Sequence, residues 1–133
     1  MSHLRAIAVA VMMSMIGLLA GCGLDQESLA AVQVTPGSGT ATVGATVNKV
    51  QFSAIGWYAP LSSGSYAPSL GKVNQHKALP NASWRTSDSV NTGIDSKGLA
   101  TCLSMTTAPA TITATASGGL YGSVSGTATL ICN

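Results

Sequence analysis

The chain has 133 residues, of which 8% are charged and 5% are aromatic, and its formal net charge is only +2. This length leaves room for one domain rather than two. Because helical cytosolic proteins usually contain far more Glu and Lys, the composition favours strands and turns. The basic residues are scattered along the chain rather than clustered, which argues against nucleic acid as a partner.

The first residues have the form of an export signal. A short basic start, MSHLR, precedes an uncharged apolar run over residues 6–20. A membrane-spanning helix needs roughly 20 apolar residues, so this shorter run is typical of a secretory signal peptide. The run ends in Leu19-Ala20-Gly21-Cys22, which resembles the bacterial lipobox. The resemblance implies a cleaved signal peptide over residues 1–21 and lipid attached to Cys22; the alternative is a core cysteine in an N-terminal helix.

Lipid on Cys22 would place the protein on a membrane. One acyl chain binds a bilayer only marginally, whereas two or three chains hold a protein there almost permanently. Residues 22–28 would then form a lipidated tether, and the membrane would be the first partner. In bacterial lipoproteins, Asp after the lipidated cysteine signals inner-membrane retention, and this chain has Gly23 instead. The resemblance therefore favours the outer membrane of a bacterial cell envelope.

The rest of the chain, residues 29–133, has the pattern of short strands. Apolar and polar residues alternate with the period of two that half-buried strands require. Turn residues separate these stretches, and no helical stripe is present, so we predict an antiparallel β-sandwich. Its core should centre on Phe52, Trp84 and Ile112. The alternating stretches are AVQVTP (31–36), KVQFSAIG (49–56), ASWRTS (82–87), ATITATAS (110–117) and GTATLICN (126–133).

With Cys22 assigned to lipid, Cys102 and Cys132 remain as an even pair. An oxidising compartment would join them, and we predict that they form a disulfide. Closing a loop of about thirty residues stabilises a fold by roughly 3–4 kcal/mol in the chain-entropy model. The alternative is a pair of free, redox-active thiols, but the spacing lacks the Cys-x-x-Cys form that lowers a thiol pKa.

Three stretches together resemble a known family. They are VQVTPGSGTATVGATVNKVQFSA, WRTSDSVNTGIDSKGLATC and ATITATASGGLYGSVSGTATLIC. In this order they resemble the bacterial Ig-like domain, group 2 (BIG2), of intimin- and invasin-type surface proteins, from about Ala31 to Cys132. The resemblance implies an Ig-like β-sandwich of about seven strands, with Trp84 between the sheets, and a role in adhesion or protein–protein contact. Two features depart from the family: a long segment at residues 58–81 and the cysteine pair.

Chemistry-bearing residues are few after the leader. His76 is the single histidine there, and no nucleophile motif surrounds any serine, so we expect no enzyme and no cofactor. One His and two separated Cys lack the spacing of a zinc site. Calcium at Asp88 and Asp95 is the remaining metal hypothesis, but TSDS and GIDSKG are simpler to interpret as Asx turns, so we expect no metal.

The long segment between the second and third expected strands is the best interaction candidate. We consider Trp57, Tyr58, Tyr66 and His76 as a candidate binding loop, because long loops on a rigid sandwich often bind partners. Aromatic rings there would suit a protein or a glycan, so a carbohydrate-binding module is the alternative function. The simpler interpretation is that Trp57 and Tyr58 only continue the preceding strand. The glycosylation sequon at Asn81 is read as a chance match.

Overall fold

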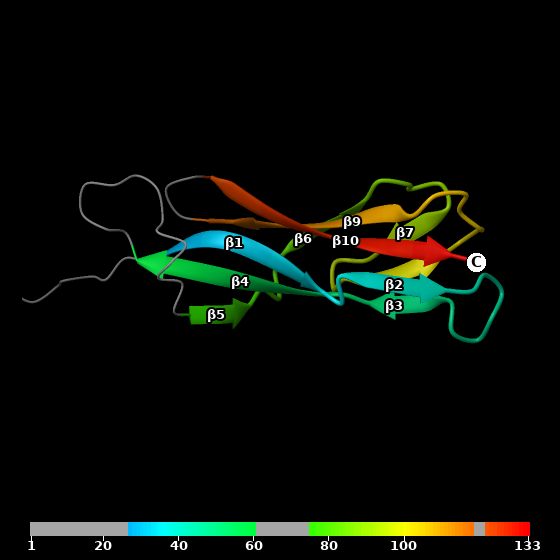
Figure 1. The fold of residues 1–133 in the computed structure, drawn as a ribbon, viewed down its shortest axis with the longest axis horizontal. Helices are drawn as coiled ribbons and strands as arrows, with labels where there is room; N and C mark the ends of the chain where they lie inside the picture. The colour runs from blue at the N-terminus through cyan, green and yellow to red at the C-terminus, as the bar shows by residue number, and fades with distance from the viewer. Residues whose placement is uncertain (1–26, 61–74, 119–121) are drawn as a thin grey trace, which may run out of the picture.

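The computed structural model describes residues 27–60, 75–118 and 122–133, and this part of the chain is all-β. It contains ten strands and no helix (Figure 1). Figure 1 shows an elongated molecule whose strands run roughly along its long axis, with the start of β1 near one end and the C-terminus at the other. The strands are β1 Glu27–Thr35, β2 Ser38–Ala41, β3 Lys49–Gln51, β4 Ser53–Pro60, β5 Gln75–Ala78, β6 Ser83–Thr86, β7 Thr92–Ile94, β8 Leu99–Cys102, β9 Ala110–Ser117 and β10 Ser123–Cys132.

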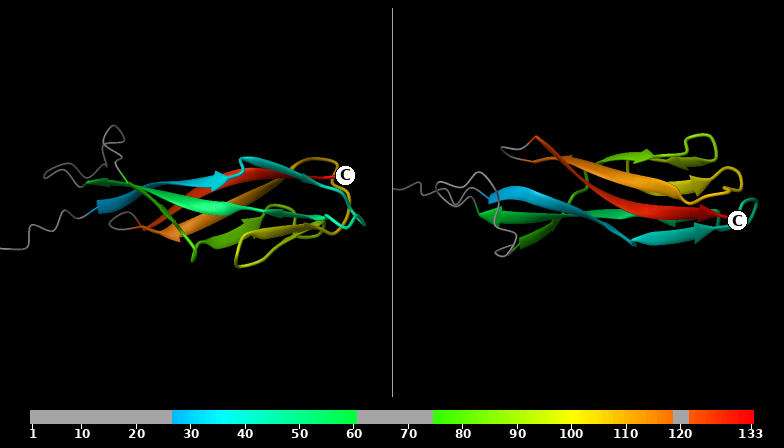
Figure 2. Two further views of the ribbon diagram at one scale, coloured as in Figure 1. Left: turned by 90° about the horizontal axis from the view of Figure 1, so that it is seen from below. Right: turned by 45° about the horizontal axis from the view of Figure 1, so that its top comes forward.

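Three small sheets build a sandwich-like fold. Their strand orders are β1-β4-β5, β2-β10-β9-β6 and β3-β8-β7. Every pairing is antiparallel except that of β2 with β10, which is parallel. The turned views in Figure 2 show β9 and β10 in one layer and the long β4 strand in the other. The expected antiparallel architecture therefore has one parallel exception.

The strand count is ten rather than about seven because two long strands change partners part-way and residues 75–78 form the additional strand β5. β1 ends at Thr35, and after Pro36 and Gly37 the chain continues as β2, which pairs with β10 instead of β4. The expected strand over residues 49–56 is likewise divided at Phe52, where pairing changes from β8 to β1. A backbone bond from the Phe52 N–H to the Gly98 carbonyl, 2.9 Å, continues the first pairing up to the break.

Period-two alternation places the apolar residues inside, as the sequence predicts. In β9 and β10, alternate residues from Ala110 to Ala114 and from Ala128 to Cys132 are buried while most residues between them face solvent. Phe52, Ile112 and Leu130 have no exposed surface. Trp84, expected at the centre of the core, is only half-buried, because β6 is the edge strand of its sheet.

Candidate functional site

The outward face of β4 and β5 brings two of the candidate binding residues together. Trp57 is the register partner of His76, and their ring centroids lie 5.4 Å apart with the planes tilted by 41°. The Trp57 indole N–H donates a hydrogen bond to Oε1 of Gln33, 3.2 Å, on the neighbouring strand β1. His76 was expected in a polar loop, but it lies in a strand that the sequence did not indicate, because residues 75–78 pair with β4. Trp57 and His76 form a small aromatic patch, the Trp57–His76 patch.

Tyr58 does not join this patch. Successive side chains of a strand point to opposite faces, and Tyr58 follows Trp57 directly. The Lys77 ammonium lies 5.2 Å from the Tyr58 ring centroid, within cation–π range, and 3.5 Å from Oε2 of Glu27. The structure thus divides the candidate loop residues between two faces. Tyr66 and Cys22 lie outside the described residues.

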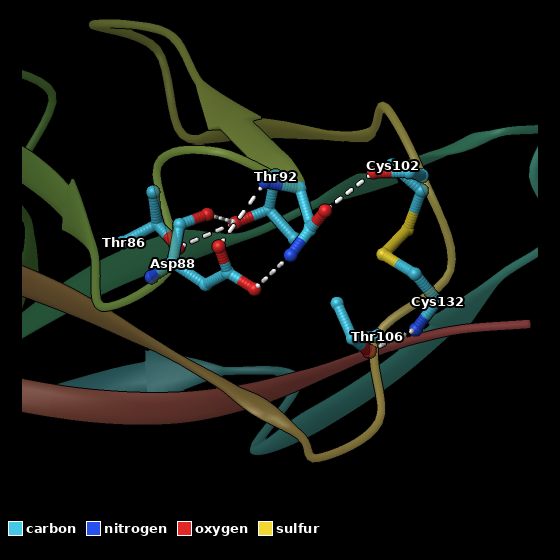
Figure 3. Close-up of a disulfide and its surroundings, with 8 residues drawn as sticks. Thr86, Asp88, Thr92, Cys102, Thr106 and Cys132 are labelled. Atoms are coloured by element: carbon cyan, nitrogen blue, oxygen red, sulfur yellow. Dashed lines mark hydrogen bonds between the residues drawn. A yellow bond between two sulfur atoms is a disulfide. The ribbon is translucent and has the colours of Figure 1, made fainter.

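A disulfide closes the opposite end of the molecule. Cys102 and Cys132 are bonded, with their Cα atoms 5.6 Å apart, and the predicted pair is therefore confirmed (Figure 3). Cys102 ends β8 and Cys132 ends β10, so the bond joins two different sheets. The Cys102 N–H donates to the Asn48 carbonyl and the Thr106 N–H donates to the Cys132 carbonyl, both at 3.0 Å. The connections before β3 and after β8 are thereby fixed to the disulfide.

The turn between β6 and β7 packs beside this disulfide (Figure 3). The Asp88 carboxylate accepts hydrogen bonds from the side-chain amide of Asn91, 2.8 Å, and from its backbone N–H, 3.1 Å. These bonds hold the pKa of Asp88 below its ordinary value. The buried Thr92 hydroxyl donates to the Asp88 carbonyl, and the Asn91 carbonyl accepts from the Leu103 N–H, 2.8 Å. The turn predicted from TSDS is confirmed, and it is tied to the connection between β8 and β9.

Large apolar side chains are exposed on these tied connections. Val90 is 80% exposed, Val47 73%, Met105 72% and Leu103 57%; we call these four residues the apolar end. Leu103 donates a hydrogen bond from its own N–H to the Asn91 carbonyl. The other three residues directly precede residues whose backbone is hydrogen-bonded at this end, namely Asn48, Asn91 and Thr106. All three connections lie at the C-terminal end in both figures (Figures 1 and 2). The apolar end was not predicted from the sequence. What marks its residues in the sequence is that they are apolar yet stand inside turn segments rather than in the alternating stretches.

The described part of the chain contains neither a group of three metal-ligating side chains nor a long apolar helix. Among residues 27–60, 75–118 and 122–133, no three His, Cys, Asp or Glu side chains are grouped as ligands for one ion. Asp95 instead accepts hydrogen bonds from the backbone N–H groups of Lys97, 2.8 Å, and Leu99, 2.9 Å, which is the Asx turn predicted from GIDSKG. No helix in this part is long and apolar enough to cross a bilayer.

Comparison with known proteins adds no relative. No protein-family model matches the chain, and no curated protein matches it.

Proposed function

We propose that this chain is a lipid-anchored Ig-like lipoprotein of the bacterial envelope, favouring the outer membrane, that makes protein–protein contacts and catalyses no reaction. The lipobox at Cys22 supports the anchor, with cleavage after residue 21, a tether over residues 22–28 and one domain over residues 29–133. The disulfide supports an oxidising location, because structural disulfides are rare in the cytosol. β1 already begins at Glu27, within the proposed tether.

The order of the strands in the sheets supports the Ig-like part of the proposal, and the BIG2 family rests on the sequence resemblance. Counting β1–β2 and β3–β4 as two interrupted strands leaves seven strands plus the short β5. One layer then has the order first, second, fifth and fourth, and the other has the order first, seventh, sixth and third. Seven-stranded Ig domains distribute their strands in this way. The extra β5 comes from the long segment that departs from the family pattern.

The apolar end is the observation that carries the proposed contact function. Single exposed apolar residues need no explanation, so what supports an interaction site is that these four side chains stand on three connections at one end of the molecule. Among the described residues, the large apolar side chains that are exposed are these four and Ile131, which precedes Cys132. Hydrogen bonds and a disulfide fix the connections that carry them, so binding would order little additional backbone. This end lies away from the start of β1, where the anchor would attach (Figure 1).

Proximity labelling from the full chain on intact cells tests the contact function. We expect a reproducible set of neighbouring proteins that is lost in the double variant Val90→Ser, Met105→Ser. Arg85→Ser, on an exposed position of β6, is the matched control and should keep the labelled set. Equal labelling by all three proteins would refute a contact through the apolar end.

Detergent partitioning tests the anchor separately. Wild-type protein should enter the detergent phase, and Cys22→Ser should remain an unacylated precursor or become soluble. Unchanged partitioning of Cys22→Ser would refute lipidation at this residue without bearing on the apolar end.

Glycan binding through the Trp57–His76 patch is the second candidate function. The observation in its favour is the pairing of the half-buried Trp57 ring with the exposed His76 ring on the outward face of β4 and β5. A glycan array distinguishes the two candidates: specific retention that is lost in Trp57→Ala, Tyr66→Ala favours glycan binding, and an array without any retention disfavours it.

A further inference from the structure

An open cleft lies between two turns on the side of the molecule where β6 and β7 are edge strands. The connection from β5 to β6 and the turn from β7 to β8 line it, together with Trp84 of β6. Its volume is about 670 Å³, within the range of small-molecule sites, roughly 300–1,000 Å³. A smaller hollow of about 140 Å³ shares Pro80, Trp84 and Lys97 with it. Trp84 therefore belongs to two adjoining cavities.

The indole of Trp84 is held on one side and lines the cleft. A Cβ atom added to Gly98 would lie 2.8 Å from Cζ2 and 2.9 Å from Cε2 of this ring, so the turn backbone packs directly against it. The side chain nevertheless remains half-buried. Among the described residues, none accepts a hydrogen bond from its indole N–H. A fixed aromatic ring with exposed surface offers a face for stacking and a free donor at its edge.

Asp95 adds a fixed acceptor to the same cleft. Its Oδ1 atom accepts both turn hydrogen bonds, from the N–H groups of Leu99 and Lys97. These bonds lower the pKa of Asp95, so the carboxylate stays ionised at neutral pH. Oδ2 accepts no hydrogen bond from the residues that the structure describes. The Asx turn therefore fixes the carboxylate through Oδ1 and leaves Oδ2 without a hydrogen-bond partner among the described residues.

We propose that this cleft binds a neutral oligosaccharide, with one sugar ring stacked on Trp84 and its hydroxyl groups donating to Oδ2 of Asp95. The Asn81 amide and the Lys97 ammonium, both exposed on the walls, are the donors for other sugar oxygens. Five of the nine lining residues are polar or charged, which disfavours an apolar ligand. Asp95 and Lys97 bring one negative and one positive charge to the cleft, and this balance favours a neutral ligand. The site is separate from the Trp57–His76 patch and depends on neither the lipid anchor nor the apolar end.

Tryptophan fluorescence can isolate this site, because the chain has only two tryptophans. In the full chain with Trp57→Phe, Trp84 is the single reporter. It is titrated with neutral trisaccharides of glucose, N-acetylglucosamine, galactose and mannose, and with trigalacturonate as the acidic counterpart. We expect a saturable change with at least one neutral trisaccharide. Trp84→Ala in the same Trp57→Phe background, followed by isothermal titration calorimetry, should show no saturable binding of that sugar.

Asp95→Asn tests the carboxylate without removing the turn, because the Asn side-chain oxygen can accept the same two backbone bonds. Replacing the ionised acceptor by an amide N–H should raise the Kd about tenfold. Asp88→Asn is the matched control, since it changes another carboxylate held in a turn, and it should leave the Kd unchanged. The proposal is overturned by no saturable binding of any neutral trisaccharide, by preferred binding of trigalacturonate, by an unchanged Kd in Asp95→Asn, or by binding that survives in Trp84→Ala.

Discussion

Gly98 is a residue at which a single added methyl group should meet two separate penalties. Its φ of +80° lies in the left-handed region, and an added Cβ would meet the Phe52 carbonyl oxygen at 2.5 Å and the Trp84 ring at 2.8 Å. The Gly98 carbonyl itself accepts the Phe52 N–H, so the two backbones cannot separate without losing a hydrogen bond. Gly98→Ala therefore combines a backbone penalty with a steric clash.

Two other glycines separate these effects. Gly44 has a similar φ of +75° but open space around an added Cβ, so Gly44→Ala carries only the left-handed penalty of about 1–2 kcal/mol. Gly126 has no positive φ, but its added Cβ would lie in contact with the Val32 carbonyl group, so Gly126→Ala carries mainly the steric cost. Overpacking of this kind costs roughly 1–3 kcal/mol. Gly98→Ala should lose about 2–5 kcal/mol, a large part of the 5–15 kcal/mol that is usual for a domain.

Urea unfolding followed by tryptophan fluorescence gives the three free energies on the full chain. At roughly 4–8 °C for each kcal/mol in a domain of this size, the Tm of Gly98→Ala should fall by about 10 °C or more. The Tm of Gly44→Ala should fall by less. Retained far-UV circular dichroism in both variants would show that each still folds. If Gly98→Ala were no less stable than Gly44→Ala, the close packing of this turn on Phe52 and Trp84 would be refuted.

Three further predictions concern other parts of the fold. Replacing both Cys102 and Cys132 by Ala should lower the free energy of unfolding by roughly 3–4 kcal/mol, and reductant should lower the wild type similarly but leave the variant unchanged; equal urea midpoints for all samples would contradict this. Ser28→Ala removes a buried hydroxyl that has no hydrogen-bond partner among the described residues, so calorimetry should show an unchanged or higher Tm, and a loss above about 1 kcal/mol would contradict the assignment. The pKa values of Asp88 and Asp95 are lowered in the folded state, so their stabilisation is present above the ordinary value of 3.8 and is lost as the pH falls below it. Replacing both by Asn should therefore reduce the drop in urea midpoint between pH 6 and pH 3, and an unchanged drop would argue against the two turns.

Local sequence patterns were sufficient to predict the buried face of individual strands, the two Asp turns and the disulfide. Alternation of apolar and polar residues places Ile112 and Leu130 inside without reference to any partner strand, because a period of two depends only on strand geometry. The two turns at Asp88 and Asp95 follow from side chains that bond to nearby backbone. The disulfide was predicted by counting cysteines on the expectation of an oxidising compartment.

Which strands pair with one another, and which side chains then lie together, became known from the three-dimensional structure. Residues 75–78 have no strand pattern of their own, and they form β5 because β4 offers them hydrogen bonds, which brings His76 beside Trp57. The change of partner at Phe52 depends on β1 and β8, which are distant in the chain. Trp84 has an inward position in the alternation, yet it lines a cleft because β6 is an edge strand and no strand beyond it covers the ring. Pairing between distant strands is non-local, so a pattern that fixes the face of each residue leaves open what that face meets.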